Sequence, residues 1–273
     1  MVYCSLGIRS KTVAHKLIQG GYTNVFNLYG GIFEWQTTVL KEMILWEMIR
    51  KKHTYFVKTR VHGYIQVKKI MSKNLLLIFT RNPELGKAKT RLAKTVGDQT
   101  ALDIYKFLLK KTRDIASKVS ADKAVYYSVS IRENDIWDAT IFQKHLQVGE
   151  DLGIRMLHAF KNGFEAGYEK VMIIGSDLYD LSSENIEKAF TELATNNLVI
   201  GPAEDGGYYL LGMNSLHTSI FKNKDWGTDT VRKNTLEDLK DKTVKLLEYK
   251  NDIDIYEDIL DIPEIMSTFI DVK

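Results

Sequence analysis

Residues 170–177 read KVMIIGSD and carry the clearest strand signal in the chain. It is a short, nearly continuous run of apolar residues that ends in an aspartate. Such runs are typical of central parallel strands, whose two faces are both covered by helices. In open α/β sheets, ligands bind at the carboxyl ends of the strands. We therefore expect Asp177 at a ligand-binding edge of a sheet.

The segments around this stretch alternate between strand patterns and helix patterns. A glycine ends one helix pattern, and a serine cap begins another. The alternation predicts an α/β domain with a mostly parallel sheet and helices on both faces. The predicted strands are 74–82, 123–130, 170–177, 197–205 and 207–213, and the predicted helices are 98–119, 151–167 and 182–196.

Composition limits the function classes. Hydrophobic residues make up 44% of the chain and charged residues 27%, as in an ordinary soluble globular protein. The net charge of +3 is too balanced to indicate nucleic acid as a general partner. A single cysteine excludes an intrachain disulfide and a multi-cysteine zinc site, and it favours a cytoplasmic setting. No apolar run is long enough to predict a membrane span.

Residues 1–70 differ in pattern from residues 71–273, and we expect the domain boundary between them. The end of the first segment, 46–74, is rich in Lys and Arg. We interpret this stretch as a solvated basic connector. A patch for nucleic acid or a membrane surface is the alternative interpretation.

The first predicted strand of the second segment runs into the loop RNPELGKAKTRL, residues 81–92. This loop holds a glycine and four basic residues before a predicted helix. Backbone N–H groups at such a loop, with Arg and Lys side chains, suit a phosphate. The glycine spacing is not that of a P-loop. The loop is therefore a candidate phosphate site, with a plain basic surface loop as the alternative.

Two aspartates follow predicted strands near this loop. Asp177 ends one strand, and we expect Asp205 at the end of the neighbouring strand of the sheet. Asp205 is followed by Gly206 and Gly207, which let another molecule approach the backbone. Carboxylates that face a phosphate loop are suited to Mg²⁺ or Mn²⁺. A helix cap for Asp177 and a turn residue for Asp205 are the structural alternatives.

Six motifs together resemble a family of transferases with the glycosyltransferase-A fold. Members of this family are associated with radical-SAM and selenoprotein-domain operons, and many are described as arsenosugar-biosynthesis-type glycosyltransferases. The resemblance covers about residues 74–262. The motifs are FTRNPELGKAKTRLA (79–93), QVGEDLGIRMLHAF (147–160), IIGSDLYDLSSENIEKAF (173–190), VIGPAEDGGYYLLGM (199–213), WGTDTV (226–231) and DIDIYEDI (252–259).

The resemblance implies a metal-dependent transferase that moves a glycosyl group from a nucleotide sugar to a small-molecule acceptor. It implies a metal at Asp177, with Asp205 as the second metal or acceptor-side position and Asp229 as a reserve base. The family usually has a proline two residues after the first aspartate, where this chain has Tyr179. The implied nucleotide-phosphate residues are Arg81, Gly86, Lys89, Arg91, Gly206 and Gly207, the last two at the acceptor-side or second metal position.

Two other activities fit the same fold and stay open at this point. A nucleotidyltransferase would grip a nucleoside triphosphate with the same basic loop, and fold alone does not choose between the two reactions. A nucleotide-binding module without turnover is the other alternative, and Tyr179 in place of the proline favours it.

The first segment begins with MVYCSLGIRS, residues 1–10, and holds the cysteine, Cys4. A thiol at the start of a loop that enters a helix is suited to thiolate chemistry. This loop, with residues 21–35 and 58–64, resembles the closing half of a rhodanese-like domain, in which Cys4 would carry a persulfide. Only the residues MVY precede this cysteine, and the family's first half is absent. We expect either an inactive remnant or a piece completed by a partner, with sulfurtransferase activity as the alternative.

Overall fold

The computed structural model describes residues 55–61, 64–70 and 72–270, with side chains from residue 72 onward. The chain divides into two compact units, Met1–Ser72 and Lys73–Lys273. Cys4 and the loop around it lie outside the described residues. In the first unit, strands β1 (Tyr55–Val61) and β2 (Tyr64–Ile70) form an antiparallel hairpin. The basic stretch that we interpreted as a connector therefore contains a two-stranded hairpin, which the sequence analysis did not predict.

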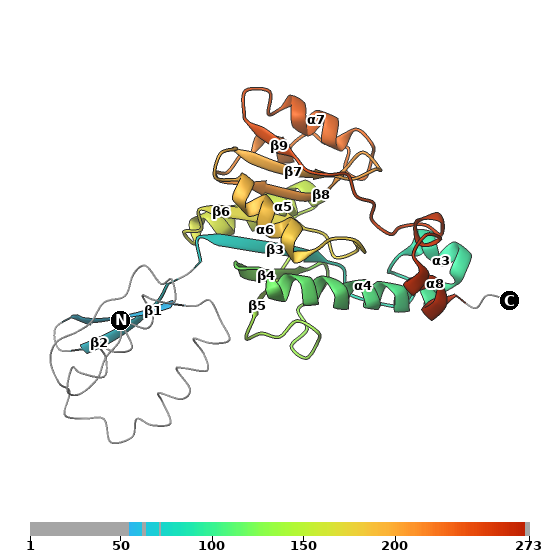
Figure 1. The fold of residues 1–273 in the computed structure, drawn as a ribbon, viewed down its shortest axis with the longest axis horizontal. Coiled ribbons are helices and arrows are strands. Elements are labelled where there is room, and N and C mark those ends of the chain that lie inside the picture. Colours follow the sequence, from blue (N-terminus) through green and yellow to red (C-terminus); the bar gives the residue numbers. More distant parts are fainter. Residues whose placement is uncertain (1–54, 62–63, 71, 271–273) are drawn as a thin grey trace, which may run out of the picture. The chain divides into compact units, whose positions relative to one another are not determined.

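The second unit is built on a seven-stranded sheet with the order β5-β4-β3-β6-β8-β7-β9 (Figure 1). β8 alone runs against its neighbours in this sheet, because it is antiparallel to both β6 and β7. The predicted mostly parallel sheet is confirmed. The strands are β3 (Asn74–Thr80), β4 (Asp122–Tyr127), β5 (Phe142–Leu146), β6 (Lys170–Ile174), β7 (Leu198–Pro202), β8 (Tyr208–Met213) and β9 (Val244–Leu246).

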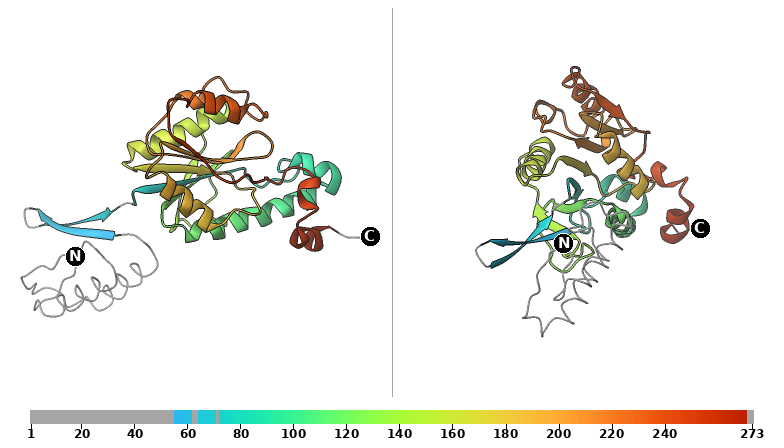
Figure 2. Two further views of the ribbon diagram at one scale, coloured as in Figure 1. Left: turned by 45° about the horizontal axis from the view of Figure 1, so that its top comes forward. Right: turned by 60° about the vertical axis from the view of Figure 1, so that its left-hand side comes forward.

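Helices cover both faces of this sheet, as the alternating sequence predicts. Side chains of α4 and α6 join one core cluster with Leu76 and Ile78 of β3, whereas α5 joins a second cluster with Leu75 and Leu77. Figure 2 shows α5 on the opposite face from α4 and α6. None of the described helices has the length and apolar character that a bilayer crossing requires. The helices are α3 (Thr90–Val96), α4 (Asp98–Lys118), α5 (Leu152–Glu165), α6 (Ser183–Glu192), η1 (Ser219–Phe221), α7 (Val231–Glu237), η2 (Glu257–Ile259) and α8 (Pro263–Phe269).

Local sequence signals set the ends of the helices. The Ser182 hydroxyl accepts a hydrogen bond from Asn185 N at 3.2 Å, and the Asn185 side chain accepts one from Ser182 N, so the predicted serine cap is a full capping box. Asp151 caps α5 by accepting from Ile154 N at 2.8 Å. Gly167, which follows the end of α5, has a φ of 94° that suits glycine. These caps hold the helices that flank the candidate site.

Two strands, β5 and β9, were not predicted from the sequence. β5, with the sequence FQKHL, is buried at Phe142 but otherwise half-buried or exposed, so it lacks a long apolar run. β9 has three residues, two of them exposed. Both lie at the edges of the sheet, where one side of a strand needs no partner and an apolar signal is weakest.

Candidate functional site

The candidate site lies where β3, β6 and β7 end and β8 begins. Ile174 of β6 and Gly201 of β7 both pair with Leu210 of β8, so β8 lies between these two strands. Asp177 and Asp205 therefore do not follow adjacent strands, which corrects the expectation from the sequence. The antiparallel β8 brings its first residues to the carboxyl edge, and both aspartates still line one pocket there.

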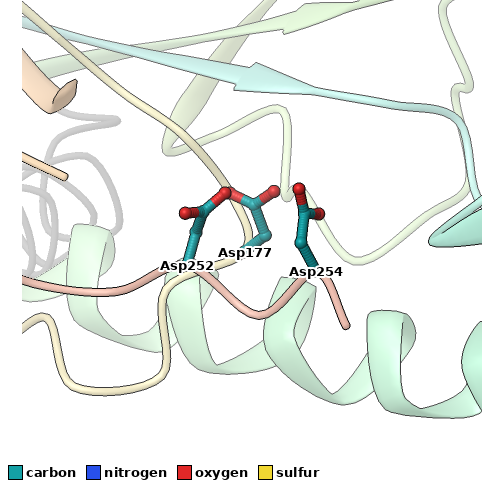
Figure 3. Close-up of side chains that lie close together, drawn as sticks. All are labelled: Asp177, Asp252 and Asp254. Carbon is teal, nitrogen blue, oxygen red and sulfur yellow. The ribbon is translucent and has the colours of Figure 1, made fainter. Parts of the chain in front are cut away.

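Three carboxylates meet at this edge, from Asp177, Asp252 and Asp254. One oxygen of each lies within 4.8 Å of the others. Figure 3 shows Asp252 and Asp254 pointing to the same side of one extended segment, toward Asp177. Ile253 between them is 1% exposed, so the alternation of an extended chain turns both carboxylates away from the core.

Backbone contacts fix the segment that carries two of these carboxylates. Ile253 N donates to Asp177 O at 3.2 Å. Asp258 accepts hydrogen bonds from Asp254 N at 2.7 Å and from Ile255 N at 2.8 Å, which closes a turn just after the cluster. The positions of Asp252 and Asp254 are therefore set by their own segment and by the turn after β6.

Lys89 is the cation at the centre of the cluster. Its Nζ donates to Asp177 Oδ2 at 2.7 Å and to Asp254 Oδ1 at 2.8 Å, and its side chain is 6% exposed. Burial lowers the pKa of Lys89, but the two carboxylates outweigh it and raise that pKa above its usual value. Arg91 forms a second ion pair with Asp254. The family resemblance implies that Lys89 and Arg91 bind phosphate. In this structure both form ion pairs with carboxylates, and their role toward phosphate stays a prediction.

Asp252 is the member of the cluster without a paired cation among the described residues. Burial, followed by repulsion from Asp177 and Asp254, raises the pKa of its carboxyl to about 6. The donor set consists of carboxylate oxygens with excess negative charge, which is the chemistry that Mg²⁺ and Mn²⁺ prefer. The residues present therefore fit a hard divalent cation.

The loop after β3 is rigidly anchored. The Tyr105 hydroxyl accepts from Arg81 N and donates to Arg81 O, both at 2.9 Å. Asn82, 2% exposed, donates to Ser130 O at 2.8 Å, which ties this loop to the one after β4. Gly86 turns the loop with a φ of 70°. The Arg81 side chain donates to Lys87 O at 3.2 Å and is exposed at the rim.

The turn between β7 and β8 carries the Asp205 carboxylate and also packs closely against the 226–231 segment. Asp205 Oδ1 accepts from Gly207 N at 2.8 Å. Gly206 has a φ of 88°, and a Cβ there would lie 2.3 Å from the backbone oxygen of Asp229. Only glycine allows this close approach, so Gly206 lets the 226–231 segment lie against the turn. Asp229 meets this turn through its backbone and is an exposed residue.

A pocket of about 210 Å³ opens beside the carboxylates. Asp177, Asp205 and Asp252 form its charged wall. Large apolar side chains line the rest, and we call four of them the apolar wall. These are Phe79, Leu152, Met156 and Trp226.

The sequence analysis missed Asp252 and Asp254 as site residues. Their stretch, NDIDIYED (251–258), alternates aspartate with isoleucine. This alternation was the available signal, because an extended segment with one buried face presents its polar residues on the other. The position of residues 251–258 in the sequence does not indicate that this segment returns to the carboxyl edge of the sheet.

Comparison with known proteins identifies the relatives of this chain. The sequence model of a family described as an uncharacterized protein conserved in bacteria (DUF2064) matches residues 111–228. A rhodanese-like domain model matches residues 1–38. A search of the curated proteins finds no significant match.

Solved structures give a closer comparison. A protein from Desulfovibrio desulfuricans G20, described as a "putative nucleotide-diphospho-sugar transferase", is 30% identical, with a TM-score of 0.65 over 73% of this chain and 93% of its own. The 4-diphosphocytidyl-2C-methyl-D-erythritol synthase of Anaerococcus prevotii is 14% identical, with a TM-score of 0.47 over 68% and 92% of the two chains. The inositol-1-phosphate CTP transferase of T. maritima is 13% identical, with a TM-score of 0.40 over 72% and 96%.

Proposed function

The chain belongs to the nucleotide-diphospho-sugar transferase family, and from this premise we propose that it transfers a glycosyl group from a nucleotide sugar to a small-molecule acceptor with the help of a divalent cation. The single observation that carries the proposal is the cluster of Asp177, Asp252 and Asp254 beside the basic loop 81–92. A carboxylate cluster next to basic side chains suits a cation that bridges to a diphosphate.

Asp177, Asp252 and Asp254 would hold Mg²⁺ or Mn²⁺. When bound, the cation neutralises charge on the nucleotide diphosphate as it leaves. Lys89 holds two of the carboxylates in place, and its buried positive charge lowers the cost of gathering three negative charges.

The exposed Arg81 and Arg91 are the groups through which the chain would bind the donor's phosphates, because guanidinium groups pair well with phosphate oxygens. Asp205 lies in the pocket wall and would accept the proton of the acceptor hydroxyl. Asp229 remains the reserve candidate for that role, from the exposed segment next to the turn.

Isothermal titration of a nucleotide sugar such as UDP-glucose, with and without Mn²⁺, tests the proposal. We expect Asp177→Ala and Asp252→Asn to weaken Mn²⁺-dependent binding at least about tenfold, because the loss even of an outer-shell partner of a metal ligand typically costs that much. Asp261→Ala is the matched control, because Asp261 is exposed and follows the same segment. Unchanged binding in both site variants would overturn the assignment.

A nucleotidyltransferase is the rival within the same fold. The same titration with nucleoside triphosphates separates the two, because a nucleotidyltransferase would bind the triphosphate and release diphosphate from it. Turnover of CTP or UTP without transfer from a nucleotide sugar would replace glycosyl transfer with nucleotidyl transfer.

The match of residues 1–38 to a rhodanese-like model favours a second candidate function, sulfur transfer through Cys4. Its test is the transfer of sulfur from thiosulfate to cyanide, with Cys4→Ser as the control. A rate that depends on Cys4 would support this activity, and a rate that Cys4→Ser leaves unchanged would reject it.

A further inference from the structure

The pocket beside the carboxylates has two chemically different sides. The apolar wall consists of four large side chains from four places in the chain: β3, the first and second turns of α5, and the segment after η1. Most of the remaining lining residues are also apolar. A concave apolar surface with a few polar groups at one end is the usual form of a small-molecule site.

Trp226 is specifically accommodated in this wall. A Cβ on Gly153 would lie 2.5 Å from two atoms of the Trp226 ring. The absence of a side chain at the start of α5 therefore lets the indole lie directly against the helix backbone. Gly153 serves this approach with an ordinary φ, so space and not backbone conformation is what requires glycine here.

All charged residues that line the pocket carry negative charge. They are Asp177, Asp205 and Asp252, and no Lys, Arg or His stands among the lining residues, all of which belong to the described part of the chain. Lys89 pairs with Asp177 but does not line the pocket. In the metal-free chain, an anion that entered would meet Asp205 and Asp252, which have no paired cation among the described residues. Their repulsion costs more in a half-buried pocket than in water.

We propose that this pocket binds the acceptor, and that the acceptor is an uncharged small molecule with an apolar body and a hydroxyl group. The apolar body would contact Trp226, Met156 and Leu152, and the hydroxyl would donate a hydrogen bond to the charged wall. The identification of this ligand as an acceptor rests on the proposed function. The volume of about 210 Å³ is below the usual range of ligand pockets, so the acceptor is small.

The transfer step balances with this acceptor. The bond between the anomeric carbon and the diphosphate oxygen breaks, and its electron pair leaves with the nucleoside diphosphate. The hydroxyl oxygen of the acceptor forms the new bond to the anomeric carbon, and its proton passes to Asp205.

Two matched probes test the charge selectivity of the pocket in the full chain without metal. Benzyl alcohol and benzoate share an apolar ring and differ in charge. Ligand-observed NMR titration should show benzyl alcohol binding at least about tenfold more tightly than benzoate. Equal binding, tighter benzoate binding, or no binding of benzyl alcohol would overturn the proposal.

Three variants sharpen this test. Trp226→Ala should weaken benzyl alcohol binding at least about fivefold, because aromatic anchors dominate small sites. Leu152→Lys puts a cation at a lining residue that is 43% exposed. It should reduce the ratio by which benzyl alcohol binds more tightly than benzoate. Leu246→Lys is the control, on a residue 45% exposed in β9 that does not line the pocket, and the preference should stay unchanged. Unaltered benzyl alcohol binding in Trp226→Ala, together with an unaltered preference in Leu152→Lys, would reject the pocket assignment.

The same preparations separate this inference from the proposed function. UDP-glucose is titrated with Mn²⁺ alongside the probes. Benzyl alcohol binding without nucleotide binding would keep the pocket and reject the transferase proposal. Nucleotide binding without benzyl alcohol binding would reject the acceptor class alone.

Discussion

The charged wall and the apolar wall of the pocket differ in how they relate to stability. The residues of the charged wall come from three segments, after β6, β7 and β9, and they crowd negative charges that repel one another. Three residues of the apolar wall belong to or pack on the second core cluster: Met156 is a member, and Phe79 and Trp226 pack against it. One wall opposes folding and the other supports it, which is the pattern expected where binding and not packing selects the residues.

Lys89→Ala should have the largest effect, because it leaves Asp177 and Asp254 without their shared buried partner. We expect a loss of about 2–4 kcal/mol in the free energy of unfolding, since removing one partner of a buried ion pair strands the other charges. Urea unfolding measures it. Lys87→Ala is the control, because Lys87 is 73% exposed and its pair with Glu84 should contribute under about 1 kcal/mol. A similar loss of unfolding free energy in Lys89→Ala and Lys87→Ala would show that the buried ion pairs of Lys89 contribute no more than an exposed one.

Gly153→Ala disturbs the apolar wall instead. The new methyl group would lie 2.5 Å from the Trp226 ring and 2.5 Å from the backbone oxygen of Phe221. We expect a loss of about 1–3 kcal/mol from overpacking, and weaker benzyl alcohol binding. Thermal unfolding of the double variant with Trp226→Ala should recover part of the loss, because the two positions are coupled. Fully additive losses would show that the ring and the glycine do not press on each other.

Asp252→Asn should raise the free energy of unfolding of the protein and weaken its Mn²⁺-dependent binding of a nucleotide sugar. The folded-state pKa of about 6 lies above the ordinary value of 3.8, so the folded state resists ionisation of this carboxyl. Its stabilising contribution is complete below pH 3.8 and is lost as the pH rises through 6. The variant should therefore be about 1 kcal/mol more stable at pH 8, after allowance for solvent screening, and equal to the natural chain near pH 3.

Unfolding curves of Asp252→Asn at pH 8, 6 and 4 check this sign. Asp261→Asn is the control and should show no pH-dependent gain, because Asp261 is exposed. Destabilisation of the Asp252→Asn variant at pH 8 would contradict this prediction, because it would show that the ionised Asp252 carboxylate stabilises the folded state.

Tyr179→Phe should have the smallest effect. The Tyr179 hydroxyl donates to Glu264 at 2.7 Å and joins the turn after Asp177 to α8, at an exposed position. Loss of this bond should cost under about 1 kcal/mol, because the ring contacts remain. The nearby aromatic partner is Phe107, with ring centroids 6.4 Å apart. A double-variant cycle with Glu264→Gln measures the coupling energy between the two residues. Zero coupling would show that this hydrogen bond contributes nothing to the free energy of unfolding.

Much of the fold could be predicted from the sequence because buried strands and capped helices carry local signals. The apolar run at 170–177 and the serine at 182 are of this kind, and both predictions hold. The strand order could not be predicted, since the insertion of β8 between β6 and β7 depends on pairing between segments. The same difference explains why β5 and β9, at the sheet edges, were missed.

The site was predicted less completely than the fold. Asp177 was found because it directly follows a buried strand. Asp252 and Asp254 were missed because their role depends on a chain return that no local pattern encodes. Lys89 pairs with two carboxylates of the candidate site, a contact that depends on its burial and that its residue type does not predict. The assignment of Arg81, Gly86 and the other loop residues to phosphate stays a prediction.

The segment that carries Asp252 and Asp254 follows every strand of the seven-stranded sheet along the chain. All seven strands are therefore synthesised before two of the three clustered carboxylates. A chain truncated before Asp252 would therefore keep all seven strands of the sheet and lose two of the three clustered carboxylates.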